Sequence, residues 1–164
     1  MNKFMEKAIR LGEIAMNKNA GGPFGAVIVC KNKIVGQGYN KVIGTNDPTK
    51  HAEMVAISNA SAKLKRFDLS DCVLYASGQP CPMCLAAIAW ARIKKVYYAN
   101  DYESTREIEF DDHDIYQFIK GSPSKINIKL IQIDKDRGAN LYRKWKNKKC
   151  LINRLIELQH LTIV

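Results

Sequence analysis

One histidine and two cysteines constrain this chain most, because each stands near the start of a segment with helical character. His51 opens the run His-Ala-Glu, and Cys81 and Cys84 belong to the run Pro-Cys-Pro-Met-Cys at residues 80–84. One imidazole and two thiolates are an established ligand set for catalytic zinc, which keeps a fourth position open for water. A single ion ties two helices together, so the motif predicts a fold in which these helices meet.

The spacing of the two cysteines fits this role. Three residues of separation place Cys81 and Cys84 on one side of a helix, so both sulfurs can converge on one ion. The first turn of a helix also favours thiolate over thiol, because its free amides and dipole stabilise negative charge. A structural zinc site or a redox pair is the alternative for this motif. A structural site would need a fourth ligand, and His113 and His160 belong to no paired motif.

Glu53 lies two residues after His51, so its side chain on a helix points away from the histidine and is poorly placed as a fourth ligand. It can instead reach a metal-bound water, take its proton to generate hydroxide at neutral pH, and later protonate the leaving group. We therefore predict one zinc ion per subunit, bound by His51, Cys81 and Cys84. Glu53 is the predicted catalytic acid and base.

Length and composition fit one globular domain. The longest apolar runs fall far short of the ~20 residues needed to cross a bilayer, so no membrane association is expected. Charged residues such as Glu6 and Arg10 interrupt the N-terminal segment, which argues against secretion and for a cytoplasmic location. Cys30, Cys72 and Cys150 match no paired motif, and we interpret them as buried or incidental thiols.

The net charge of +10 raises the question of nucleic-acid binding. Residues 141–149 hold five basic side chains and two aromatic ones. However, 19 of the 26 basic residues are lysines, and isoleucine and asparagine are also abundant. All three have A/T-rich codons, so genome base composition accounts for much of the excess. We therefore keep nucleic acid as an alternative partner but do not favour it.

The order of periodic segments predicts an α/β fold. The expected helices are residues 2–17, 51–63, 82–91, 112–120 and 136–149, and the expected strands are residues 24–29, 34–39, 72–76, 96–99 and 126–132. Such alternation indicates a five-stranded mixed sheet covered on both sides, a three-layer α/β/α arrangement. We expect one domain over residues 1–149. Residues 150–164 form either an amphipathic helical extension or a loosely ordered appendage.

The pattern H-x-E followed by P-C-x-x-C is the known signature of zinc-dependent nucleobase deaminases. Over residues 1–149 the chain resembles the cytidine deaminase-like superfamily. The resemblance implies a five-stranded sheet between helices, zinc at the N-termini of two helices, and a homodimer. It also implies that zinc-bound hydroxide attacks a ring carbon that carries an exocyclic amine, after which ammonia leaves.

Further segments resemble the bacterial guanine deaminases of this superfamily. They are Gly-Gly-Pro-Phe-Gly-Ala-Val at 21–27, Asn-Asp-Pro-Thr at 46–49, Trp-Ala-Arg at 90–92 and Phe-Asp-Asp at 110–112. The resemblance implies a pocket for a free purine base, with Asn40 and Asp112 as base contacts. Phe24 is available to stack on the ring, and Trp90 is placed at a dimer contact near the pocket. The expected reaction converts guanine to xanthine and ammonia.

The residues alone also allow plainer roles. Phe24 can belong to a structural turn, Asp112 to a solvated helix start, and Trp90 to core or interface packing. The chain departs from the guanine deaminases at two places. Gln79 precedes Pro80 and Cys81, where those enzymes usually have Glu, and the C-terminal end at residues 150–164 is altered.

Three alternatives to guanine deamination remain. A tRNA-specific adenosine deaminase, which forms inosine, shares the catalytic core and would use the basic surface. Those enzymes typically carry a Gly/Ala/Ser-rich segment after the fourth strand, whereas residues 100–109 here are acidic and suit a phosphate backbone poorly. The other two are a deaminase of another amino-heterocycle and a non-catalytic zinc or RNA-binding module.

Overall fold

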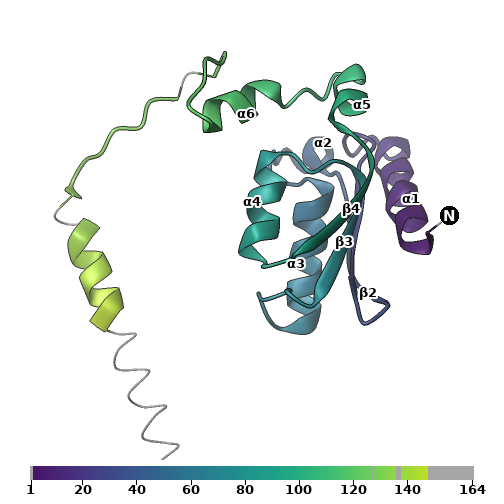
Figure 1. The fold of residues 1–164 in the computed structure, drawn as a ribbon, viewed down its shortest axis with the longest axis horizontal. Coiled ribbons are helices and arrows are strands. Elements are labelled where there is room, and N and C mark those ends of the chain that lie inside the picture. Colours follow the sequence, from purple (N-terminus) through teal and green to yellow (C-terminus); the bar gives the residue numbers. More distant parts are fainter. Residues whose placement is uncertain (1, 127, 136–137, 148–164) are drawn as a thin grey trace, which may run out of the picture. The chain divides into compact units, whose positions relative to one another are not determined.

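The computed structural model describes residues 2–126, 128–135 and 138–147 (Figure 1). The chain divides into two units, residues 1–126 and 127–164, and the sheet belongs to the first. The predicted domain end at residue 149 and the extension at 150–164 lie outside the described residues. Within the described part, every helix is too short or too polar to cross a membrane.

Ten helices and strands follow one another in the first unit. In chain order they are α1 (Lys3–Asn17), β1 (Gly25–Cys30), β2 (Lys33–Tyr39), α2 (Val42–Thr45), α3 (Ala52–Leu64), β3 (Cys72–Gly78), α4 (Pro82–Trp90), β4 (Lys95–Asn100), α5 (Tyr102–Glu107) and α6 (His113–Ile119). Eight of them confirm predicted segments to within two residues. The short helices α2 and α5 have no predicted counterpart.

The sheet has the strand order β2-β1-β3-β4 and is mixed. Strand β1 pairs antiparallel with β2 and with β3, whereas β3 and β4 run parallel. Side chains of β1 alternate between the two faces. Val27 and Val29 pack in one cluster with Phe4 and Leu11 of α1, and Ile28 packs in another with residues of α3 and α4. Helix α1 therefore covers one face, and α3 and α4 cover the other (Figure 1).

The prediction of a fifth strand at residues 126–132 is wrong: the described residues form four strands, and residues 128–134 are neither helix nor strand. A strand requires a neighbouring backbone for its N–H and C=O groups, and the alternation of Ile128 and Leu130 specifies only a side-chain pattern. The predicted helix 136–149 is present over residues 138–147, and its remaining positions lie outside the described part.

Small residues bring α3 close to β2. Ala52, Ala56 and Ala60 recur every four residues on α3 and are completely buried. They face glycines of β2, where a Cβ atom added to Gly38 would lie 2.5 Å from the carbonyl oxygen of Ala52 and 2.7 Å from the nitrogen of Ala56. Only a residue without a side chain permits this approach. The contact fixes where α3 begins, and hence where His51 and Glu53 lie.

We expect Gly38→Ala to destabilise the metal-free protein by about 1–3 kcal/mol, because the added methyl group must push the α3 backbone away from β2. Urea unfolding measures this loss, and zinc affinity should fall with it. Gly44→Ala is the matched control, since its added Cβ would meet no atom closer than 3.4 Å. Equal stability of the two variants would show that α3 does not depend on this approach.

Candidate active site

The first turns of α3 and α4 carry the predicted metal ligands. His51 is the N-cap residue of α3, and Cys81 is the N-cap residue of α4. Cys84 follows in the first turn of α4, where Pro82 occupies a position that needs no backbone donor. The chain turns from β3 into α4 within residues 79–81, so this helix begins at the end of the central strand.

The three ligand atoms lie together. The Nδ1 atom of His51 is 3.5 Å from the Sγ atom of Cys81 and 3.7 Å from that of Cys84. Tetrahedral zinc with ordinary Zn–S and Zn–N bonds separates sulfur from nitrogen by about 3.6 Å. The donor set and its spacing therefore fit zinc, as the sequence predicts.

Electrostatics at this cluster favour a thiolate. The pKa of Cys81 is lowered to about 4, first because Cys84 donates a hydrogen bond to its sulfur and also because His51 lies beside it. The pKa of Cys84 is raised, because it retains the shared proton next to Cys81 and is buried. The hydrogen bond with Cys81 in turn raises the pKa of His51. One thiolate is therefore favoured at this cluster, and binding of a cation would displace the protons that Cys84 and His51 hold.

Glu53 lies beside this cluster and is buried, with 7% of its surface exposed. Burial raises the pKa of its carboxyl group, because removal from water disfavours the charged form, and the negative charge of Cys81 raises it further. A carboxyl group whose pKa is raised exchanges protons more readily near neutral pH.

A cavity of about 540 Å³ opens over this cluster. Six of the eight predicted site residues line it: Phe24, Asn40, His51, Glu53, Cys81 and Asp112. Cys84 is fully buried and is not part of the lining. Trp90 ends α4 and is 85% exposed, outside the described lining. Its contact with a base stays a prediction.

Backbone contacts hold Asn40 and the aromatic wall in place. The N–H of Asn40 donates to the carbonyl oxygen of Phe24 at 2.9 Å, and its side-chain oxygen accepts from the N–H of Val42 at 3.1 Å. The rings of Phe24 and Phe110 meet edge to face, with centroids 5.1 Å apart. A Cβ atom on Gly22 would lie 2.6 Å from the Phe110 ring, so this aromatic pair requires the glycine.

The segment that carries Asp112 is tied to the cavity by polar contacts. The hydroxyl group of Tyr102 donates to Asp111 at 2.9 Å, and that of Tyr116 donates to the carbonyl oxygen of Pro80 at 3.4 Å. Partial burial raises the pKa of Asp112, and the charge of Cys81 raises it further. Asp112 therefore retains a proton more readily than an exposed aspartate.

Other lining residues were not predicted from the sequence: Ile43, Pro48, Met83, Thr105, Glu109 and Ile115. Pro48 and Met83 belong to the runs at 46–49 and 80–84, which the sequence does not assign to the cavity wall. The other four come from separate elements, and no sequence pattern marks them. Gln79, which the sequence singles out as a departure, also lines the cavity, and its side-chain oxygen accepts the N–H of Tyr102 at 3.1 Å. This bond links the start of α5 to the cavity wall.

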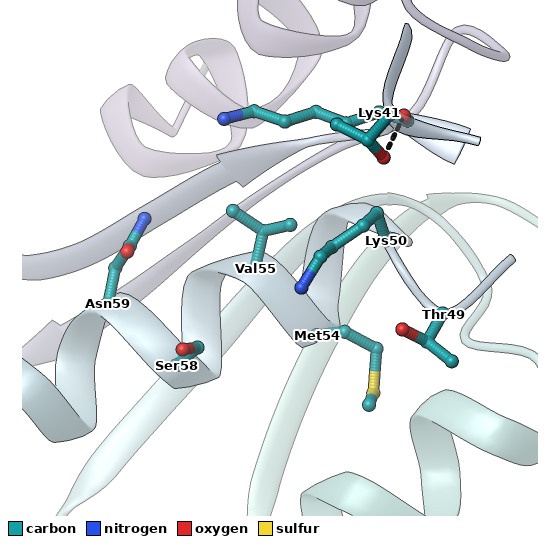
Figure 2. Close-up of a pocket in the computed structure, with 8 residues that line it drawn as sticks. Lys41, Thr49, Lys50, Met54, Val55, Ser58 and Asn59 are labelled. Carbon is teal, nitrogen blue, oxygen red and sulfur yellow. Dashed lines mark hydrogen bonds between the residues drawn. The ribbon is translucent and has the colours of Figure 1, made fainter. Parts of the chain in front are cut away.

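A second hollow of about 350 Å³ lies between α3 and the segment after β2 (Figure 2). It is lined by Lys41, Thr45, Thr49, Lys50, Met54, Val55, Ser58 and Asn59. None of these side chains is a histidine, cysteine or carboxylate, so the hollow offers no metal ligand of the usual kinds. The chemistry therefore belongs to the larger cavity.

We expect Cys81→Ser to lose zinc, because a hydroxyl group replaces the thiolate that joins α4 to the ion. Metal analysis should show about one zinc ion less per chain in the variant than in the wild type. Zinc at a thousandfold excess over its Kd adds about 4 kcal/mol to the stability of a folded chain, and the variant loses that contribution. Cys150→Ser is the control and should keep its zinc. Equal zinc content of Cys81→Ser and wild type would contradict the ligand assignment.

Comparison with known proteins bears on this site directly. The family described as the cytidine and deoxycytidylate deaminase zinc-binding region matches residues 1–100. Guanine deaminase of Bacillus subtilis (strain 168) is 42% identical over 144 residues, which cover 88% of this chain and 92% of that protein. The X-ray structure of guanine deaminase from Bacillus subtilis has a TM-score of 0.81 at 41% identity, covering 90% of this chain and 95% of the other.

A second kind of relative is more distant. The tRNA-specific adenosine deaminase of Buchnera aphidicola subsp. Schizaphis graminum is 34% identical over 132 residues, covering 80% of this chain and 85% of that protein. Both kinds of relative are deaminases, and the matched region contains His51, Glu53 and both cysteines of the cluster. The chain belongs to the cytidine and deoxycytidylate deaminase family of zinc-binding proteins.

Proposed function

We propose that this hydrolase converts guanine and water to xanthine and ammonia. The observation that carries the proposal is the placement of Glu53 beside three convergent metal ligands, in the wall of a cavity large enough for a purine base. The relative that matches most of the chain, at 42% identity, is a guanine deaminase. The cofactor is zinc, which the donor set fits.

His51, Cys81 and Cys84 would hold this zinc. The ion supplies Lewis acidity, which makes water a competent nucleophile at neutral pH. His51 and Cys81 are part of the cavity lining, so a zinc ion held by these residues would act next to a base bound in the cavity. The protein thus presents the substrate and the nucleophile to each other at one place.

Glu53 moves the protons. Its carboxylate accepts a proton from the attacking water as oxygen bonds to the ring carbon that carries the amino group. It delivers this proton to a ring nitrogen of the base. It then takes the second proton from the hydroxyl group now bonded to the carbon and gives it to the departing nitrogen, so the carbon–nitrogen bond breaks, a carbonyl group forms and ammonia leaves. The raised pKa of Glu53 suits a group that must both accept and release a proton.

The cavity wall orients the base. Phe24 and Phe110 form an aromatic wall against which a flat ring can pack, and the amide of Asn40 is held in one plane by its bond to Val42. Asp112, with its raised pKa, is suited to exchange a hydrogen bond or a proton with the purine edge. Trp90 is proposed to act near the pocket only in the assembled protein, because in one chain it is exposed.

We also propose a cytoplasmic homodimer. Large apolar side chains are exposed on α4 and β4, namely Leu85, Trp90, Tyr97 and Tyr98. Burial of such side chains against a second copy is a common basis of a stable interface. The four described cysteines are free thiols, as a reducing compartment maintains them.

Glu53→Gln should lower kcat on guanine by about 10²–10⁴-fold, because the amide cannot accept the proton of water. Zinc content should equal that of the wild type, since Glu53 is not a proposed ligand. Glu6→Gln makes the same chemical change in the first turn of α1, at an exposed position, and should leave kcat unchanged. Full activity of Glu53→Gln would support a non-catalytic zinc module instead.

A substrate panel tests the choice of base. Zinc-loaded protein should release xanthine from guanine faster than it deaminates adenine, cytosine, their nucleosides, amino-triazines or tRNA.

Asp112→Asn should lower kcat/KM on guanine by about 10–100-fold, the value of a hydrogen bond to a charged group. Asp114→Asn is the control, because Asp114 begins the same helix but does not line the cavity.

The tRNA alternative predicts a different outcome. A tight, salt-sensitive complex with tRNA and formation of inosine, without xanthine formation, would overturn the guanine proposal. Against this alternative stand Glu109, Asp111 and Asp112, three acidic side chains in the cavity lining that would repel a phosphate backbone.

A further inference from the structure

A second group of metal-binding side chains lies at the other end of the sheet. Cys30 is the last residue of β1, Cys72 is the first residue of β3, and the strand register places them directly opposite each other. The pair Ala26 and Ala76 marks the catalytic end of the same two strands. Four residues of strand separate the two ends by about 13 Å, so this group is distinct from the catalytic cluster.

Asp71 brings a carboxylate to both thiols. The thiol of Cys30 donates to one oxygen of Asp71 at 3.4 Å, and that of Cys72 donates to the other oxygen at 3.5 Å. All three ligand atoms lie within 4.8 Å of one another. Tetrahedral zinc with ordinary Zn–S and Zn–O bonds separates sulfur from oxygen by about 3.5 Å, so the donors are already spaced for an ion.

The two metal-binding groups have similar donor distances, although both sulfurs of the first group face one nitrogen and each sulfur of the second group faces a different oxygen of Asp71. Sulfur lies 3.5–3.7 Å from nitrogen at the catalytic ligands. At the second group sulfur lies 3.4–3.5 Å from oxygen, although the sequence around it contains no paired motif. The pairing of β1 with β3 brings Cys30 next to Cys72, just as the C-x-x-C spacing on α4 brings Cys81 next to Cys84.

Burial raises the pKa of the Cys72 thiol to about 12, so an ion must displace its proton, whereas solvent access and the charge balance favour an ion. Cys72 is 2% exposed, whereas the side chain of Asp71 is 44% exposed, which leaves a path from solvent on the carboxylate side. Arg66 binds Asp71 at 2.6 Å and holds the carboxylate in position. The charges of the complex would sum to zero. The two thiolates and the carboxylate contribute three negative charges, and the guanidinium of Arg66 and the divalent cation contribute three positive charges.

We propose that Cys30, Asp71 and Cys72 form a second binding site, for a thiophilic divalent ion such as Zn²⁺ or Cd²⁺. Two sulfurs and one oxygen select borderline and soft ions over Mg²⁺ and Ca²⁺, which prefer oxygen ligands. Occupancy would join the end of β1 to the start of β3 and stabilise this end of the sheet. The site takes no part in the proposed deamination.

Cadmium alone is the probe. The full-length protein with one catalytic zinc is titrated with Cd²⁺, and bound zinc and cadmium are counted together with the thiolate-to-cadmium absorbance. Wild type should bind one ion more per chain than the double variant Cys30→Ala and Cys72→Ala. Cys150→Ser is the control and should bind as many ions as wild type. Equal metal content of wild type and double variant would overturn the proposal, as would loss of the extra ion in Cys150→Ser.

Asp71→Asn provides a test that does not depend on a buried substitution. The change is isosteric and partly exposed, so it should preserve the fold. We expect the affinity for the second ion to fall at least tenfold, while the catalytic zinc and the guanine activity remain. Retention of wild-type affinity would exclude Asp71 as a ligand and contradict the site. Because Cd²⁺ binding is counted directly, the result stands even if guanine is not the substrate.

Discussion

Two helix N-termini must meet at one point for this chain to bind its catalytic ion, and the rest of the structure depends on that meeting. Helix α3 is placed by the close contact of its alanine face with the glycines of β2. Helix α4 is placed by the short link from β3. Both helices pack on the same face of the sheet, which therefore sets the separation of His51 from the cysteines, and no local segment could do so alone.

The same packing creates the electrostatics of the site. Placing α3 against the sheet buries Glu53, and burial raises the pKa of its carboxyl group. Placing Cys81 beside Cys84 and His51 lowers the pKa of its thiol. A carboxyl group that gains a proton easily thus lies beside a thiol that loses one easily. This contrast suits an enzyme that must bind a cation and transfer protons within one cavity.

Local patterns predicted much of this protein because the relevant forces act over short stretches of chain. The core strands, the long helices and the hairpin follow from hydrophobic period and turn chemistry, and the metal ligands follow from their spacing. The prediction of a fifth strand at residues 126–132 was wrong, because alternating apolar side chains do not provide a neighbouring strand for backbone hydrogen bonds. Ile43, Thr105 and Ile115 line the cavity without any sequence signal, since each comes from a different element.

The sequence by itself determined the class of fold and supplied the proposed ligand types and the proposed acid–base residue, because side-chain chemistry and period are properties of the chain. Only the tertiary structure decided which residues enclose the cavity and that Trp90 stands outside its described lining. It also decided that Cys30 and Cys72, forty-two positions apart, lie side by side with Asp71. Proximity between distant residues arises from strand register and helix packing, which no short segment specifies.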